Sequence, residues 1–195
     1  YLCPQSLFKI HPDNDALFAQ VLAADPLGHL VFFQGRNEAV TRAFEQRLMG
    51  NLGQLGVQGS SRVSFLGYLP HADFLCVNAV SDVMLDTRHW SGGNTSLDAI
   101  AMGLPMVTLP GKLMRSRQSA AMLRRTGLDE LVVSDPEGYV REAVRLATDR
   151  EWREHCRRRL AQGASALFDD PMPVQALASL LDRLHQGDDS PAVSP

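Results

Sequence analysis

Cysteine is scarce in this 195-residue chain, and the three cysteines lie far apart in the sequence. Cys3, Cys76 and Cys156 form no CxxC pair, which argues against a disulfide framework and against a cysteine-based zinc site. No apolar run approaches the roughly 20 residues of a membrane-spanning helix, and the N-terminus lacks the pattern of a signal peptide. These absences favour a cytoplasmic protein that contacts no membrane.

An excess of positive charge is also missing, because 19 Lys and Arg face 22 Asp and Glu, for a net charge of −3. This balance argues against nucleic acid as a partner. The sequence holds no HExxH, DxD or Cys/His ligand set, and its histidines have no partner spacing typical of a metal site. We therefore expect no metal and no other cofactor.

Short apolar segments alternate with helical patterns from the first residues to about Thr148. We expect strands at 2–6, 30–34, 63–66, 82–85, 105–109 and 131–133. Helices are expected at 13–24, 38–50, 71–79, 94–102, 113–126 and 136–147. This order predicts an α/β fold, with residues 1–148 forming a Rossmann-like, doubly wound parallel sheet.

Strand patterns stop after Thr148, and two helical patterns follow at 150–163 and 172–185. We expect residues 149–186 to pack on the sheet domain as C-terminal helices. Residues 187–195, rich in Asp, Ser and Pro, are predicted to be a disordered tail. Because the chain begins with Tyr1 rather than Met and enters a strand almost at once, we expect it to be a fragment of a longer protein.

A glycine turn between a buried strand and a helix is the most informative local feature. Gly92 and Gly93 allow a tight turn and a close backbone approach, and residues that favour helix caps follow them: Asn94, Thr95 and Ser96. Unpaired amides and roughly half a positive charge at the helix start suit a phosphate or diphosphate.

One turn further along the same helix face lies Asp98. A carboxylate there would repel a phosphate but accepts hydrogen bonds from ribose hydroxyls, as in other nucleotide-binding α/β sites. The alternative is an ordinary glycine-rich loop followed by a solvated aspartate.

The segment DTRHWSGGNTSLDAIAMGLPMVTLPG, residues 86–111, resembles the C-terminal catalytic half of the O-linked N-acetylglucosamine transferases, in particular their bacterial, tetratricopeptide-repeat-associated branch. The likeness runs along nearly the whole chain and includes LFKIHP at 7–12, RVSF at 62–65 and LDEL at 128–131. It implies the UDP-sugar-binding half of an inverting, two-domain GT-B glycosyltransferase that moves N-acetylglucosamine from UDP to protein Ser or Thr.

The same resemblance implies partners outside this chain, namely an N-terminal Rossmann-like domain, tetratricopeptide repeats and a protein acceptor. The general base would lie outside the chain, so the chain alone is expected to bind the donor without turnover.

Three residues match functional positions of the family. The resemblance implies that Thr95 contacts the diphosphate, that Asp98 binds ribose and that Lys9 is the essential lysine that neutralises the UDP leaving group. The chain departs from the better-known eukaryotic members at Gly93 and Asn94, where they carry histidine and threonine.

Further binding residues follow from the same resemblance. Gln5 or Ser6 would serve as the family's glutamine near the lysine, Leu69 and His71 would flank the uracil, and Phe74 would stack on it or belong to the core. The family has a histidine and an arginine where this chain has Phe74 and Val77.

Arg115 and Arg117 are expected to open the helix after Gly111, where they would reach the diphosphate, the missing domain or the acceptor, or form a solvated basic face. His89 and Trp90 precede the glycines and would border the sugar. Two other functions stay open: a nucleotide-sugar epimerase, whose usual carboxylate pair is not evident here, and a non-catalytic interaction module.

Overall fold

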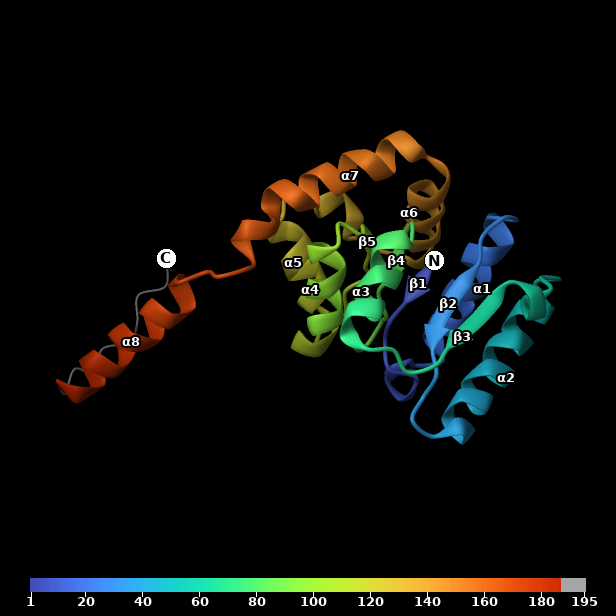
Figure 1. Cartoon of the computed structure of the whole chain (residues 1–195), viewed down its shortest axis with the longest axis horizontal. Helices are drawn as coiled ribbons and strands as arrows, with labels where there is room; N and C mark the ends of the chain where they lie inside the picture. The colour runs from blue at the N-terminus through green and yellow to red at the C-terminus, as the bar shows by residue number, and fades with distance from the viewer. Residues whose placement is uncertain (187–195) are drawn as a thin grey trace.

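A five-stranded parallel sheet lies at the centre of the computed structural model, which describes residues 1–186 (Figure 1). Its strands are β1 (Leu2–Cys3), β2 (Leu30–Phe33), β3 (Val63–Leu66), β4 (Met84–Leu85) and β5 (Met106–Val107), in the order β3-β2-β1-β4-β5. Residues 131–133, predicted as a strand, form only an isolated parallel bridge, between Val132 and Thr108, the residue that follows β5. The predicted doubly wound sheet is confirmed.

Helices cover both faces of this sheet (Figure 1). They are α1 (Asp13–Ala24), α2 (Glu38–Gln54), α3 (His71–Val80), α4 (Asn94–Ala101), α5 (Gln118–Arg125), α6 (Pro136–Thr148), α7 (Arg150–Gly163) and α8 (Met172–His185). Helix α1 packs against both α2 and α6, and α3 packs against α4 on the opposite face. The predicted bounds of α1, α7, α8 and β3 match those of the structure.

Aromatic side chains hold β2 and β3 to each other and to helices α1 and α2. Phe32 on β2 lies 5.4 Å from Phe18 and 5.0 Å from Phe44, measured between ring centroids, and stacks on Phe65 of β3 at 5.6 Å. Such contacts add to the free energy gained by burying the rings, so this half of the sheet is a rigid base for the loops beyond it.

The predicted helix over residues 113–126 is wrong at its start. A 3-10 turn (Met114–Ser116) comes first and α5 begins only at Gln118, because the backbone of Arg117, with φ −133° and ψ 4°, leaves the helical conformation. Arg115 and Arg117 therefore precede the helix that they were expected to open.

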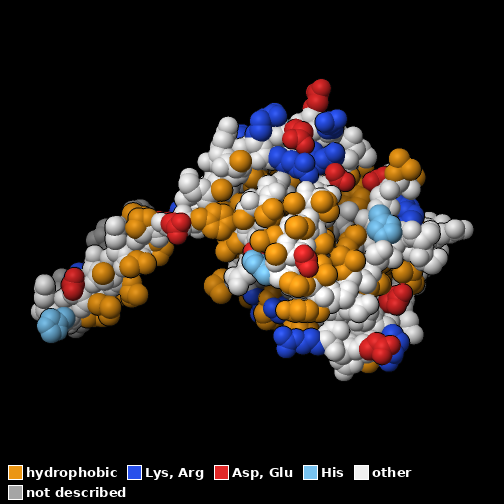
Figure 2. Space-filling view, in the orientation of Figure 1, with side chains coloured by type: hydrophobic (Ala, Val, Ile, Leu, Met, Phe, Trp, Pro, Cys, Tyr) orange, Lys and Arg blue, Asp and Glu red, His pale blue; other side chains and the backbone are white. Residues whose placement is uncertain are grey.

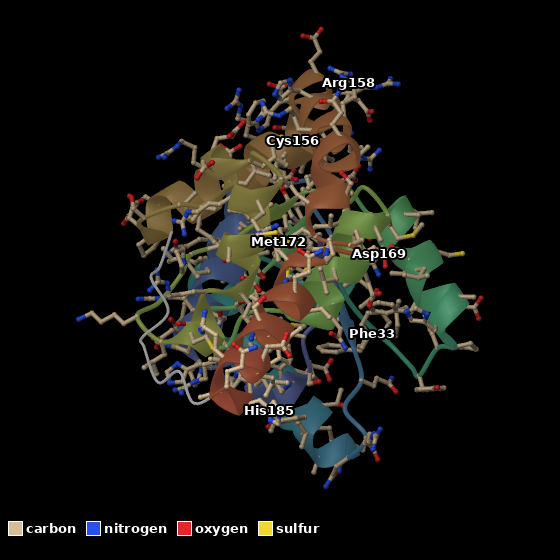
Figure 3. All side chains as sticks on the ribbon, turned by 90° about the vertical axis from the view of Figure 1, so that its left-hand side faces the viewer. Phe33, Cys156, Arg158, Asp169, Met172 and His185 are labelled. Carbon is tan, nitrogen blue, oxygen red and sulfur yellow. The ribbon has the colours of Figure 1, made fainter. Side chains whose placement is uncertain are left out.

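The two C-terminal helices differ in how they meet the sheet domain. Helix α7 packs on α4 and α6 and buries Cys156 and Leu160. Helix α8 buries no residue and extends away from the domain, with Met172 at its start and His185 at its end (Figures 1 and 3). The expectation that all of residues 149–186 pack on the domain is therefore wrong for α8.

The segment before α8 explains its direction. Asp169 has a left-handed backbone (φ 58°), and Arg125 pairs with Asp170 at 2.9 Å, so the chain turns outward at this point. Figure 2 shows apolar side chains along the projecting helix. The predicted disordered tail, residues 187–195, lies outside the described residues.

All three cysteines are free thiols. Among residues 1–186, no helix is both long enough and apolar enough to cross a membrane.

Candidate functional site

The candidate site lies where the order of the strands changes direction. The chain places β2 and β3 on one side of β1 and then β4 and β5 on its other side. At such a switch point the loops after two neighbouring strands separate and leave a crevice at the carboxyl edge of the sheet. Here the two loops are residues 4–12 after β1 and residues 86–93 after β4.

Asp86, the first residue after β4, organises the glycine turn. One oxygen of its buried carboxylate accepts a hydrogen bond from the Gly92 amide at 2.8 Å, and the other accepts one from the Thr108 hydroxyl at 2.6 Å. Its carbonyl accepts a hydrogen bond from the Tyr139 hydroxyl at 2.8 Å. Burial raises the pKa of Asp86 to about 6, and the hydrogen bonds from Thr108 and Gly92 oppose that shift.

The turn leaves no room for a side chain at Gly92. A Cβ atom there would lie 2.2 Å from Ser96 Oγ and 2.9 Å from Thr95 Oγ1. Ser96 is fixed in turn by Ser119, whose hydroxyl lies 2.8 Å from Ser96 Oγ. Glycine at position 92 is therefore required by the packing of the turn itself, and the close approach of a ligand to this backbone stays a prediction.

The start of α4 carries no side-chain cap. Gly93 is the N-cap residue, and Ser96, one of the expected capping residues, bonds to Ser119 instead. Among the described residues, no hydrogen-bond acceptor is found for the amides of Gly93, Asn94 and Thr95. Three neighbouring amides at a helix N-terminus can bind an anion, because the helix dipole adds positive potential there.

Trp90 brings the β1 loop and the β4 loop together. The ammonium of Lys9 lies 4.9 Å from the centroid of its ring, and the guanidinium of Arg115 lies 5.9 Å from the same ring. Gln5 is buried and donates a hydrogen bond to the Trp90 carbonyl at 3.0 Å. Lys9 has no carboxylate partner within residues 1–186, so its charge is not neutralised by the protein.

The remaining residues of this group are less closely tied to it. Ser6 is exposed, and its amide donates to Gln5 Oε1 at 3.0 Å. Arg117 is exposed, and no carboxylate partner is found for it in the part of the chain that the structure describes.

A second group of predicted residues lies where β3 leads into α3. His71 at the start of α3 places Nε2 3.4 Å from Asp98 Oδ1 on α4, which brings the predicted base-binding loop beside the predicted ribose carboxylate. The Phe74 ring stacks on the His71 ring, with centroids 6.3 Å apart, and also contacts the Phe33 ring, with centroids 5.3 Å apart. Leu69 is half-buried two residues before His71.

The geometry therefore combines a row of open amides, an unpaired ammonium, and an exposed imidazole beside a carboxylate. The model of glycosyl transferase family 41 matches residues 1–177 of the chain. The chain belongs to glycosyl transferase family 41.

Relatives of this family-41 chain are similar over most of its length. It is 32% identical over 184 residues to the UDP-N-acetylglucosamine–peptide N-acetylglucosaminyltransferase of Caenorhabditis elegans. This match covers 91% of the chain and 15% of the worm protein. It is 31% identical over 145 residues to SPINDLY of Arabidopsis thaliana, a probable enzyme of the same name. This match covers 74% of the chain and 16% of SPINDLY.

Among solved structures, a mutant of the O-GlcNAc transferase of Thermobaculum terrenum matches with a TM-score of 0.81 and 31% identity. That match covers 93% of the chain and 35% of the Thermobaculum protein. The family-41 chain thus has the fold of one Rossmann-like half of a GT-B glycosyltransferase, and it spans 15–19% of the length of the first curated relatives that it matches.

Sequence reasoning missed the residues that shape the turn, namely Asp86, Ser119 and Tyr139. Asp86 had a local signal, since a carboxylate directly after a buried strand is a common ligand or turn anchor. Ser119 and Tyr139 had none, because their partners lie far away in the sequence.

Proposed function

We propose that this chain is the UDP-sugar-binding domain of an inverting glycosyltransferase that transfers N-acetylglucosamine from UDP to Ser or Thr of proteins. The proposal rests on the row of open amides at Gly93–Thr95, together with the unpaired ammonium of Lys9, which contacts Trp90 in the loop that leads into those amides. The names of the relatives specify UDP-N-acetylglucosamine as donor and a peptide as acceptor.

The diphosphate would bind at the start of α4. The amides of Gly93, Asn94 and Thr95 would donate to its oxygens, and the Thr95 hydroxyl would add a further donor. Lys9 would neutralise the charge that develops on departing UDP. Contact with the face of Trp90 suits this role, because a π-face orients the ammonium without cancelling its charge.

The nucleoside would extend toward α3. Asp98 would accept hydrogen bonds from the ribose hydroxyls, and Leu69, His71 and Phe74 would border the uracil. Gln5 supports this arrangement by holding the Trp90 carbonyl, whereas Ser6 is exposed beside it.

Arg115 is placed to add a second positive charge next to Trp90, and Arg117 is better placed for the acceptor or for another domain. Two cationic side chains and a helix start can supply the charge that a divalent cation supplies in other transferases. We therefore propose that donor binding needs no metal and no other cofactor.

We further propose that the chain acts in the cytoplasm, next to an N-terminal Rossmann-like domain and tetratricopeptide repeats of a bacterial protein, and without nucleic acid or a membrane as partner. The small share of each relative that the chain covers supports additional domains, and the free thiols suit a reducing compartment. The general base would belong to the other half, so this chain alone would bind the donor without transferring the sugar.

Calorimetric titration of the chain with UDP tests the proposal, with ADP and GDP as competing nucleotides. We expect UDP to bind selectively, and we expect Asp98→Asn and Thr95→Val each to weaken it by about 10- to 100-fold, the usual effect of losing a hydrogen bond to a charged group. Asp182→Asn on the exposed α8 is the matched control and should leave UDP binding unchanged.

No UDP binding by a folded chain would contradict the proposal and favour a non-catalytic interaction module. Equal binding of the three nucleotides would contradict the assignment of the base-binding loop.

A further inference from the structure

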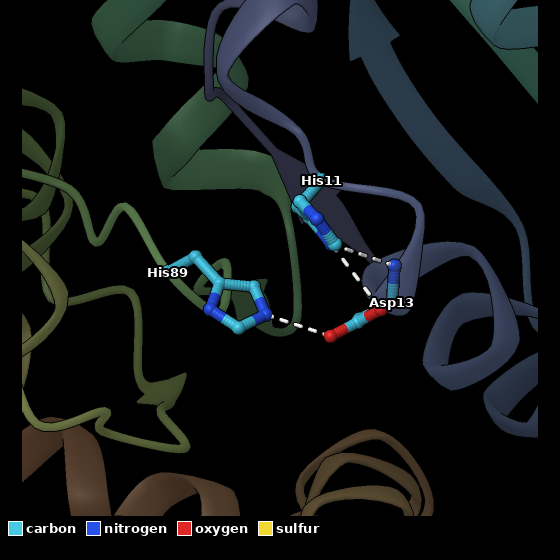
Figure 4. A group of neighbouring side chains, drawn as sticks. All are labelled: His11, Asp13 and His89. Atoms are coloured by element: carbon cyan, nitrogen blue, oxygen red, sulfur yellow. Dashed lines mark hydrogen bonds and ion pairs between the residues drawn. The ribbon is translucent and has the colours of Figure 1, made fainter.

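Two histidines and an aspartate meet beside the candidate site, although they are far apart in the sequence (Figure 4). His89 Nε2 lies 2.7 Å from one carboxylate oxygen of Asp13, and His11 Nδ1 lies 3.2 Å from the other. The two imidazole rings are in edge contact, with centroids 4.5 Å apart. All three side chains are exposed, and one potential ligand atom from each lies within 4.8 Å of the other two.

We propose that His11, Asp13 and His89 form a binding site for a divalent transition-metal ion such as Zn²⁺. Two imidazole nitrogens and one carboxylate oxygen are ligands typical of zinc, nickel and copper, whereas magnesium and calcium prefer oxygen ligands alone. Three protein ligands on an exposed surface leave the fourth position of a tetrahedral ion open to water or to a ligand.

The ligand spacing needs only a small adjustment. Zinc binds nitrogen and oxygen at about 2.0–2.1 Å, so ligand atoms in a tetrahedral site are about 3.4 Å apart. The atoms here lie within 4.8 Å of one another, and the side chains are free to rotate because they are solvent-exposed. A metal ion would replace two hydrogen bonds, the one between His89 Nε2 and the Asp13 carboxylate and the one that the Asp13 amide donates to His11 Nδ1 at 3.2 Å.

A buried asparagine fixes the backbone on both sides of the cluster. The side chain of Asn14 donates to the His11 carbonyl at 2.9 Å, and its oxygen accepts from the Arg88 amide at 2.7 Å. Asn14 is fully buried and follows Asp13 directly, so one side chain positions the backbone next to all three ligands. Support of this kind from outside the ligand shell is what holds metal ligands in place in proteins.

The His89 backbone gives a second sign that the cluster is held in place. Its φ of 69° lies in the left-handed region, which is uncommon for residues other than glycine, although histidine, asparagine and aspartate adopt it more often than most. The hydrogen bonds of the flanking residues maintain this conformation: the Trp90 carbonyl accepts from Thr87 at 2.6 Å, and the Ser91 amide donates to the Arg115 carbonyl at 2.8 Å.

The metal site does not depend on the proposed transferase function, because it is argued from the geometry of its three ligands alone; His89 was also expected to border the sugar of the donor. The metal site joins the start of α1 to the loop that carries Trp90, so a bound ion would clamp the segment that leads into the glycine turn. The neighbouring positive charge of Arg88 acts on the same carboxylate and opposes a cation. We therefore expect micromolar affinity, not the far tighter binding of a structural zinc site.

Titration of the metal-free chain with Zn²⁺, without nucleotide, tests the proposal, and Co²⁺ serves as a spectroscopic probe of coordination. We expect one saturable site and visible Co²⁺ absorption, with Zn²⁺ affinity at least about tenfold lower in Asp13→Asn and in His89→Asn. Asparagine suits position 89 because it tolerates the left-handed backbone. His185→Asn on α8 is the control for nonspecific binding to surface histidines.

Unchanged Zn²⁺ affinity in both cluster variants, or an equal loss in His185→Asn, would overturn the proposal. So would the absence of saturable binding by a wild-type chain whose circular dichroism shows it to be folded. Because UDP is absent from the experiment, none of these results bears on the proposed donor site.

Discussion

The carboxylate of Asp86 and the amide of Gly92 are joined by a 2.8 Å hydrogen bond that closes the loop after β4 into the glycine turn. Asp86 is buried, and burial raises its pKa from 3.8 to about 6. The same carboxylate therefore shapes the candidate site and makes the stability of the fold depend on pH.

Replacing Asp86 with asparagine should remove this pH dependence. The folded chain binds more protons than the unfolded chain between the two pKa values, so the contribution of Asp86 to stability is largest below about pH 4 and falls as pH rises toward about 6. The free energy of unfolding of wild type, relative to Asp86→Asn, should therefore fall by about 3 kcal/mol over that range. Urea denaturation at several pH values measures it.

Asp135→Asn is the control for that experiment. Asp135 caps α6 through the Gly138 amide, which lowers its pKa, so its contribution is present above the unfolded pKa and is lost as pH falls. The two variants should thus show pH dependences of opposite sign, and equal signs would contradict the account of Asp86.

Alanine at Gly92 should destabilise the turn far more than alanine at Gly93. A Cβ at Gly92 would lie 2.2 Å from Ser96 Oγ, whereas at Gly93 the nearest atom is the flexible Gln118 Oε1 at 3.1 Å. We expect Gly92→Ala to lower the free energy of unfolding by about 1–3 kcal/mol, the usual cost of overpacking, and Gly93→Ala by less than about 1 kcal/mol. Thermal or chemical denaturation of both variants would reveal a reversed order if the packing is described wrongly.

Tryptophan fluorescence should report UDP binding through Trp90 alone. The Lys9 ammonium lies 4.9 Å from the Trp90 ring, so an anion that draws Lys9 away changes the surroundings of that indole. Trp152 contacts Arg145 and His155 on α6 and α7, away from the glycine turn. The UDP-dependent change in fluorescence should vanish in Trp90→Phe and persist in Trp152→Phe. The opposite pattern would show that Lys9 and Trp90 do not belong to the donor site.

Leucines on α7 and α8 should differ sharply in their contribution to stability. Leu160 on α7 is fully buried, and Leu160→Ala should lower the free energy of unfolding by about 2–5 kcal/mol. Leu177 on α8 is 57% exposed, and Leu177→Ala should change it by less than about 0.5 kcal/mol. Comparable losses in the two variants would mean that α8 packs on the domain in solution.

The fold was predictable because its signals are local. Each buried parallel strand is a short apolar run and each helix has its own periodicity, so β3 (Val63–Leu66) and α1 (Asp13–Ala24) could be bounded correctly from the sequence. The position of α8 was not predictable in this way. Its apolar residues indicate that the helix packs against another surface, but they do not indicate whether that surface belongs to this domain.

The candidate site was predictable where its residues are neighbours in the sequence, and not where they meet only in the fold. Gly92, Gly93 and Thr95 are neighbours in the sequence, so the turn and the helix start could be recognised together. The contact of His71 with Asp98 crosses 27 residues, and that of Asp13 with His89 crosses 76. Spacing between residues gave no sign of the second contact, and for that reason the sequence indicated no metal site among the histidines.

The most direct test of the donor site is a residue-resolved NMR titration of the ¹⁵N-labelled chain with UDP. If UDP binds at the start of α4, the largest amide shifts will occur at Gly93, Asn94, Thr95 and Asp98. No significant shift is expected at Gly28, His29 or Thr148, which line a separate cavity of 480 Å³ at the opposite edge of the sheet. Shifts confined to that cavity, or no shifts at the start of α4 when UDP is bound, would contradict the account.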